Sequence, residues 1–117
     1  MKVRKIAQIL EARIEVEGSS LDLEIEAVCG ADLMSDVMAF AKDHVLLLTG
    51  LVSPQVIRTA EMLDIKAVVL VRGKKPDTNM LRMAEEKGIT LLSTKESMFT
   101  ACGKLYCMGL TKRGIRD

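Results

Sequence analysis

The chain has 117 residues, of which 49% are hydrophobic and 28% charged, a composition that indicates one folded domain and excludes a disordered protein. Its 17 basic and 16 acidic residues leave a net charge of +1, so no general attraction to nucleic acid or to an anionic membrane is expected. Aromatic residues make up only 3%, which leaves an aliphatic core filled out by eight methionines and no platform for stacking bases.

The first part of the chain predicts two helices and two half-exposed strands. Apolar residues recur at helical spacing over residues 3–10, which predicts a short helix. Residues 12–16 and 21–28 alternate apolar and charged side chains, the pattern of strands with one solvated face, and a Gly-Ser-Ser loop separates them. Residues 33–42 then predict a helix with an apolar stripe formed by Leu33, Val37, Met38 and Ala41.

The second part predicts repeated strand–helix units. VLLL at residues 45–48 and AVVLV at residues 67–71 are continuous apolar runs, which are typical of parallel strands buried on both faces. Each is followed by a glycine, a proline and a helical pattern, and ITLLS at residues 89–93 begins a third unit. Three such units imply right-handed crossovers. The predicted fold class is therefore α/β, a three-layer α/β/α sandwich with a central, mostly parallel sheet, in a single domain over residues 1–117 that ends in a flexible basic tail at 110–117.

Short polar motifs mark where the helices of these units begin and end. Ser53 before Pro54 predicts an N-cap, as does Asp77. Ser93, with Glu96 three residues later, fits a capping box, and Gly88 fits a left-handed helix stop. These signals favour the architecture and carry no functional information.

Ligands of open parallel sheets tend to bind at the carboxyl edge of the strands, where helix N-termini offer free N–H groups to an anion. The candidate ligand- or partner-binding residues are Thr49, Gly50, Leu51, Ser53, Arg72, Gly73, Lys74, Lys75, Ser93, Thr94 and, on the helix at 33–42, Ser35 and Asp36. Neither GxGxxG nor a P-loop motif is present. A solvated basic loop and ordinary capping residues are therefore the competing interpretation of the same set.

Catalytic and metal-binding groups are not expected. Cys29, Cys102 and Cys107 lack CxxC spacing and a nearby histidine, so we expect buried, reduced thiols and no metal. His44, the single histidine, has no recognisable nucleophile, which argues against an enzyme and against a cofactor. No apolar run approaches the roughly 18 residues that span a bilayer, and the charged N-terminus argues against a secretory signal, so we expect a cytoplasmic protein with no membrane contact.

Four stretches in order, GADLMSDVMAFAK, VLLLTG, VVLVRGKKPD and LLSTKESMFTACGKLYCMGL, resemble the DRTGG domain in its small stand-alone form. The resemblance runs from about Val28 to Leu110. That family is similar to the N-terminal domain of HPr kinase/phosphorylase, and related copies accompany CBS domain pairs or precede a phosphotransacetylase domain. The resemblance implies a fold like that N-terminal domain and a regulatory or assembly role, with the chemistry performed by partners.

The chain departs from the family pattern in both of its named turns. Gly50 is followed by Leu51-Val52 where the family has Asp-Arg, and Gly73 lies in Arg-Gly-Lys instead of Thr-Gly-Gly. The chain has no phosphate-binding loop, so kinase activity does not carry over. An apolar pair at this edge favours contact with protein, and we expect Leu51 to take part in self-association.

These observations predict a non-catalytic regulatory or protein-interaction module that self-associates, as a dimer, or that contacts another protein. The alternative is a small-molecule sensor that binds a nucleotide or another anionic metabolite at the strand edge. Nucleic acid and membranes are not expected as partners.

Overall fold

A computed structural model describes residues 1–42 and 44–115 of the chain. Helices and strands alternate from the second strand onward, as the apolar runs predict. Their bounds are α1 Val3–Ile9, β1 Arg13–Val16, β2 Ala27–Gly30, α2 Met34–Phe40, β3 Val45–Thr49, α3 Pro54–Met62, β4 Ala67–Leu70, α4 Thr78–Lys87, β5 Thr90–Ser93 and α5 Met98–Cys107. No helix of these residues is long and apolar enough to cross a membrane.

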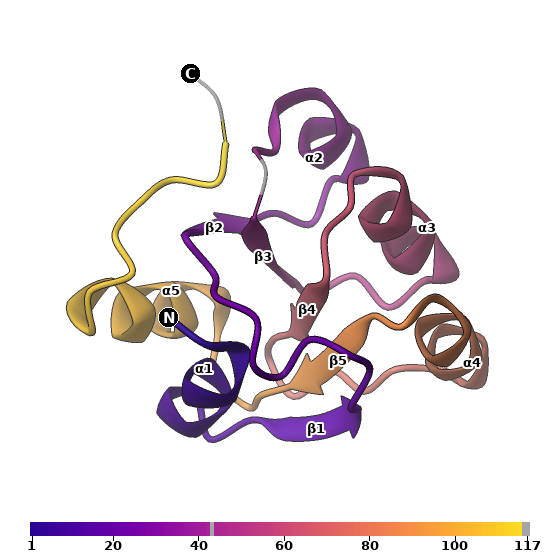
Figure 1. Ribbon diagram of the computed structural model, residues 1–117, viewed down its shortest axis with the longest axis horizontal. Coiled ribbons are helices and arrows are strands. Elements are labelled where there is room, and N and C mark those ends of the chain that lie inside the picture. Colours follow the sequence, from indigo (N-terminus) through magenta and orange to yellow (C-terminus); the bar gives the residue numbers. More distant parts are fainter. Residues whose placement is uncertain (43, 116–117) are drawn as a thin grey trace.

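The strands form one sheet in the order β1-β5-β4-β3-β2. Strands β2 to β5 are parallel and lie side by side in chain order, and β1 pairs antiparallel with β5. Because every right-handed crossover here steps in the same direction, α2, α3 and α4 all cover one face of the sheet. Helices α1 and α5 cover the other face (Figure 1). The predicted three-layer α/β/α fold with a mostly parallel sheet is confirmed.

Each face of the sheet has its own apolar core. Leu47 of β3 packs with α2, α3 and α4, whereas its neighbours Leu46 and Leu48 pack with α1 and α5. This alternation follows from the two-residue period of a strand. All three leucines are fully buried, which explains why β3 appears in the sequence as an unbroken apolar run. Burial of each such side chain contributes about 1.5–3 kcal/mol.

The prediction of a strand over residues 21–28 is wrong for most of its length, because only Ala27 and Val28 belong to β2. Residues 21–25 run beside the start of the chain instead: the N–H of Arg4 donates to the Leu21 carbonyl at 2.8 Å, and that of Ile25 donates to Met1 at 2.7 Å. Leu21 and Ile25 bury their side chains in the core under α1 and α5. Residues 21–22 form a turn, in which the N–H of Leu23 donates to the Ser20 carbonyl at 3.1 Å, but the burial of Leu21 and Ile25 gives the same apolar pattern as an edge strand, which caused the error.

Two further local predictions are also corrected. In α2, Met34 and Val37 are buried, but Leu33 and Met38 are 60% and 45% exposed, because the helix begins at Met34 and lasts only seven residues. Ser93 does not cap a helix: it ends β5, and Ser97 caps α5 by accepting the N–H of Thr100 at 3.1 Å. The caps at Ser53 and Asp77 and the left-handed stop at Gly88 are confirmed.

The segment after α5 is not the free tail that the sequence suggests. Val28 donates its N–H to Lys112 at 3.2 Å and accepts the N–H of Gly114 at 2.7 Å, so residues 112–114 cover the outer edge of β2. Leu110 is buried in the core. An uncovered edge strand exposes unpaired backbone groups, and this segment satisfies part of them. Residues 116–117 lie outside the described residues.

Candidate functional site

The carboxyl ends of β2, β3 and β4 meet at Asp32, two residues after β2. One carboxylate oxygen of Asp32, Oδ1, accepts the N–H of Gly50 at 2.7 Å and the hydroxyl of Thr49 at 3.3 Å. Its Oδ2 lies 3.5 Å from Nη2 of Arg72. The Thr49 hydroxyl also accepts the N–H of Leu51 at 3.2 Å. These contacts join three strand ends and engage Thr49, Gly50 and Arg72 of the predicted site.

Arg72 lies directly over Gly50. A Cβ atom at Gly50 would overlap the guanidinium group, so a larger residue there would require the Arg72 side chain to move aside. Arg72 and Gly73 both have left-handed backbones, with φ of 62° and 70°, and the N–H of Lys74 donates to the Val71 carbonyl at 3.2 Å. A tight turn of this kind requires two left-handed residues, at a cost of about 1–2 kcal/mol where the residue is not glycine.

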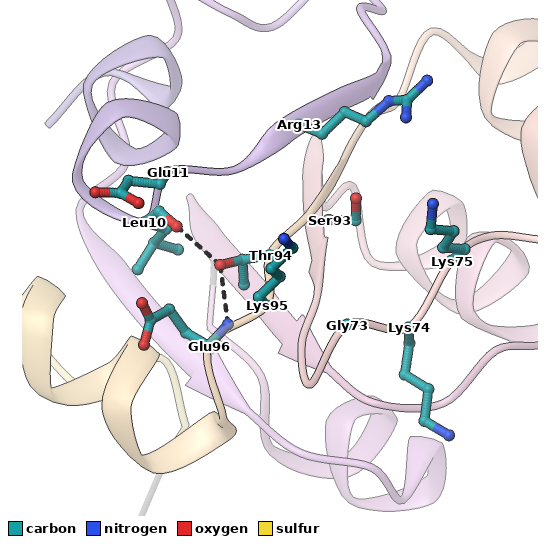
Figure 2. A pocket seen from close by; sticks show the side chains of 10 residues that line it. All are labelled: Leu10, Glu11, Arg13, Gly73, Lys74, Lys75, Ser93, Thr94, Lys95 and Glu96. Carbon is teal, nitrogen blue, oxygen red and sulfur yellow. Dashed lines mark hydrogen bonds between the residues drawn. The ribbon is translucent and has the colours of Figure 1, made fainter.

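A pocket of about 350 Å³ opens on the other side of this turn. Its walls come from the α1–β1 connection and β1, the turn after β4, and the segment after β5 (Figure 2). The chain segments after β4 and β5 are joined by their backbones, because Arg72 donates its N–H to Glu96 at 2.7 Å and Gly73 donates to Thr94 at 2.9 Å. The pocket therefore has a floor that is held by hydrogen bonds.

The topology explains why the pocket forms at this place. The chain leaves β4 toward α4 on one face of the sheet and leaves β5 toward α5 on the other face. Diverging connections leave a crevice outside the carboxyl ends of two neighbouring parallel strands, which is where open α/β sheets commonly bind ligands. The connections from β2 to β3 and from β3 to β4 both cross the same face of the sheet, through α2 and α3, so they do not diverge.

The pocket lining carries more positive than negative charge. Its basic residues are Arg13, Lys74, Lys75 and Lys95, and its acidic residues are Glu11 and Glu96. Glu96 already pairs with Lys104 at 2.8 Å, a hydrogen bond that raises the pKa of Lys104 above its usual range. Arg13 pairs through Nε with Glu15 at 3.0 Å. The three lysines of the lining form no ion pair with another residue that the structure describes.

Comparison with known proteins identifies the family. A family model for the DRTGG domain matches residues 5–107. The chain belongs to the DRTGG domain family. No curated protein matches its sequence.

The fold of this DRTGG domain is similar to that of a solved structure, the CBS and DRTGG domains of the regulatory region of Clostridium perfringens pyrophosphatase, crystallised with the activator diadenosine tetraphosphate. The TM-score is 0.72 at 15% sequence identity, over 89% of this chain and 45% of that one. At this identity the similarity shows the fold alone. The chain thus spans less than half of the length of that structure.

The structure divides the predicted site residues of this DRTGG domain into three groups. Gly73, Lys74, Lys75, Ser93 and Thr94 line the pocket, whereas Thr49, Gly50 and Arg72 surround Asp32. The remaining four line neither place: Leu51, Ser53, Ser35 and Asp36.

Several of these residues make contacts within the domain. The hydroxyl of Thr94 is buried, donates to the Leu10 carbonyl at 2.8 Å and accepts the N–H of Glu96 at 3.2 Å. Ser53 caps α3. Leu51 is half-buried against the core, which accounts for an apolar residue at that position. Ser35 and Asp36 are exposed on α2.

Sequence reasoning missed Asp32 and Arg13 as site residues. Asp32 was hidden by the misplaced second strand: once β2 is seen to end at Gly30, the aspartate falls at the carboxyl edge. Arg13 could not be found from its own segment, because its place depends on the pairing of β1 with β5, which sets Arg13 directly opposite Ser93.

The three cysteines lie in different environments. Cys29 is buried and Cys102 half-buried, but Cys107 is exposed, so the expectation of three buried thiols is wrong for Cys107. Burial raises the pKa of Cys29 to about 11, with a smaller contribution from Cys102, whose own pKa is raised by burial. The described residues contain no cluster of three or more His, Cys, Asp or Glu side chains suited to a metal ion.

The buried thiol makes stability depend on alkaline pH. Because the pKa of Cys29 is raised from 9.0 to about 11, the folded chain holds this proton more tightly than the unfolded chain. The stabilisation is present below pH 9 and is lost as the pH rises through about 11. Urea midpoints measured from pH 8 to 11 should therefore fall more steeply for the wild type than for Cys29→Ala. Parallel curves for the two proteins would contradict the burial of this thiol.

Proposed function

We propose that this DRTGG domain is a non-catalytic regulatory module that acts by self-association, as a dimer, and that α5 forms the contact. The observation that carries the proposal is the outer face of α5. Phe99 is 88% exposed and Tyr106 63%, whereas Met108, directly after the helix, is 53% exposed but lies on the opposite side of the helix axis. Large apolar side chains that gather on one exposed face are typical of interaction sites.

The outer face of α5 differs from those of the helices on the other side of the sheet. In α3 and α4 the exposed positions include Arg58, Glu61, Arg82 and Glu85, as expected for surfaces in contact with water. In α5 the one charged residue is Lys104, and it is half-buried and paired with Glu96. Depletion of charge together with exposed Phe and Tyr side chains is the composition of an interface core.

The spacing of the two aromatic residues suits a second copy of the same helix. Phe99 and Tyr106 are seven residues apart, so they lie on the same face of α5. Gly103 lies between them, and a Cβ atom there would touch nothing within 4 Å. Two α5 helices that pack antiparallel about a two-fold axis between Cys102 and Gly103 set Phe99 of each copy opposite Tyr106 of the other. The glycine lets the two backbones approach closely.

Phe99→Glu should weaken the dimer at least about tenfold, because it places a charge in a desolvated contact that occurs twice in a symmetric pair. Sedimentation velocity over a range of protein concentrations measures the effect. The matched control is Met62→Glu on α3, where the side chain is 66% exposed among charged neighbours, and this variant should dimerise like the wild type. A wild-type protein that stays monomeric at high concentration, or equal effects of the two variants, would refute the proposed contact.

The pocket supports a second candidate function, a sensor for a nucleotide or another anionic metabolite. Three lysines without ion pairs among the described residues line one crevice at the carboxyl edge of the sheet. The regulatory region that shares this fold was crystallised with a nucleotide activator. On this proposal, ligand binding in the pocket would change the contact of the domain with a partner protein or with its second copy.

A further inference from the structure

We propose that the pocket between β1, β4 and β5 binds a diphosphate group, through Arg13, Lys75, Ser93 and Lys95. This inference rests on the sensor, the second candidate function above, and specifies its site and its ligand class. It narrows the candidate site from the whole carboxyl edge of the parallel strands, as expected from the sequence, to this pocket.

Few polar side chains of the predicted site remain free to bind a ligand. Thr49, Thr94 and Arg72 are engaged with Asp32, Leu10 and neighbouring backbone groups, as described above. Ser93 is different: its hydroxyl is only partly buried and makes no hydrogen bond with any residue in the described part of the chain. Ser93 is therefore the hydroxyl of the lining that can donate to a ligand.

Basic side chains of the pocket lie around the Ser93 hydroxyl. Arg13 and Ser93 are direct cross-strand partners, so their Cβ atoms lie about 5 Å apart. Figure 2 shows Arg13, Ser93 and Lys75 on the same side of the pocket, with Lys95 beside Thr94, whereas Lys74 extends away from them. The Nε of Arg13 is held by Glu15, which leaves its terminal nitrogens for an acceptor in the pocket. Three separate segments thus bring donors to one place.

The lining of the pocket carries positive charge that a bound anion can neutralise. The four basic and two acidic side chains of the lining, together with Glu15 and Lys104 that pair with two of them, leave a surplus of two positive charges. The donors lie in two groups, with Arg13, Lys75 and Ser93 on one side of the pocket and Lys95 beside Thr94, and the pocket volume is about 350 Å³. Two linked phosphates can contact both groups at once, whereas a single phosphate can contact only one of them.

The pocket lining offers no aromatic side chain to a nucleobase. None of its lining residues is aromatic, and its one large apolar side chain, Leu10, is buried in the core. A nucleobase would find no surface on which to stack. Recognition therefore falls on the phosphates, so inorganic pyrophosphate, ADP and GDP should bind with similar affinity.

Glu11 gives the proposal a test of opposite sign. It lies at the end of the pocket away from Arg13 and Lys75, beside Glu96 (Figure 2), and its carboxylate forms no ion pair with a described residue. Its charge repels a bound anion without contacting it. Glu11→Gln should therefore strengthen binding of a diphosphate about twofold, while loss of a lysine weakens it.

Calorimetric titration of the full chain with inorganic pyrophosphate, without divalent cations and at low salt, tests the site. Lys75→Ala and Lys95→Ala should each weaken binding about fivefold, which corresponds to about 1 kcal/mol for an exposed charge contact. The matched control is Lys66→Ala, which removes the same charge at the opposite end of β4 and should bind like the wild type. Inorganic phosphate should bind at least about tenfold more weakly than pyrophosphate.

The possible failures separate the site from the functions proposed above. Pyrophosphate binding that Lys66→Ala weakens as much as Lys75→Ala would show a diffuse charge effect and overturn the site. Tight binding of ADP but not of pyrophosphate would overturn the diphosphate class, yet leave the sensor standing. If neither ligand binds, both the site and the sensor fail, while the α5 dimer, measured by sedimentation, is unaffected.

Discussion

Gly18→Ala lowers the free energy of unfolding by about 3 kcal/mol. Gly18 lies in the turn after β1 with φ of 60°, a conformation that costs a residue with a Cβ about 1–2 kcal/mol. A Cβ atom there would also lie 2.8 Å from the carbonyl carbon of Ile89 and from the backbone nitrogen of Thr90. Backbone atoms at the start of β5 cannot move aside as a flexible side chain can, so overpacking adds to the strain.

The same turn shows what this substitution would disturb. Thr90 donates its hydroxyl to the Glu17 carbonyl at 2.7 Å and accepts the N–H of Ser20 at 3.3 Å. These bonds fix the connection after β1 to the beginning of β5, and with it the pairing that places Arg13 opposite Ser93. We expect a lower urea midpoint and weaker ligand binding in the same variant.

Gly73→Ala is the matched control for Gly18→Ala. Gly73 has a similar φ of 70°, but a Cβ atom there would meet nothing within 4 Å. Its free energy of unfolding should therefore fall by only about 1 kcal/mol, the cost of the left-handed backbone for a residue with a Cβ atom. Equal losses in the two variants would mean that the turn after β1 does not press against β5 as the structure describes.

Asp32→Ala should cost about 2 kcal/mol, the second largest effect that we expect. The substitution leaves the buried N–H of Gly50 without its acceptor at 2.7 Å and removes one of the two partners of the Thr49 hydroxyl, which is fully buried. It also removes the side-chain partner of Arg72, whose left-handed backbone remains held by the turn and by the N–H bond to the Glu96 carbonyl at 2.7 Å. Chemical denaturation gives the free energy, and amide hydrogen exchange at Gly50 reports the loss locally.

Asp32→Asn tests whether hydrogen bonding or charge is responsible. Asparagine keeps an oxygen that can accept from Gly50, so most of the stability should remain, because the contact with Arg72 is long, at 3.5 Å, and exposed. Asp22→Ala removes an exposed carboxylate paired with Arg4 at 3.3 Å and should change stability little. An Asp32→Asn variant as unstable as Asp32→Ala would assign the effect to the ion pair instead.

The sequence was sufficient where one segment carries the whole signal. The runs at β3 and β4 are apolar at every position because each strand faces a core on both sides, and no other element of a small domain has that composition. Ser53 and Asp77 mark helix starts because a cap acts within three residues of its own position. The order of the strand–helix units and the parallel sheet follow from such local patterns.

Sequence reasoning failed where a pattern has two physical causes. Residues 21–25 alternate because Leu21 and Ile25 face the core under α1 and α5, and the edge strand β1 alternates because it lies beside β5. Ser93 and Ser97 both precede a helix by a few residues, and only the end of β5 shows which of them caps it. The displaced second strand then concealed Asp32.

The sequence by itself determined the α/β class, the parallel strands, most helix starts and the family to which the chain belongs, because each depends on neighbours along the chain. Only the tertiary structure decided which polar residues are free. Thr49, Thr94 and Arg72 are engaged by residues 17, 84 and 40 positions away, whereas Ser93 is not. The pocket likewise depends on α4 and α5 leaving the sheet on opposite faces and on β1 joining β5. These are contacts between distant segments, and local spacing does not encode them.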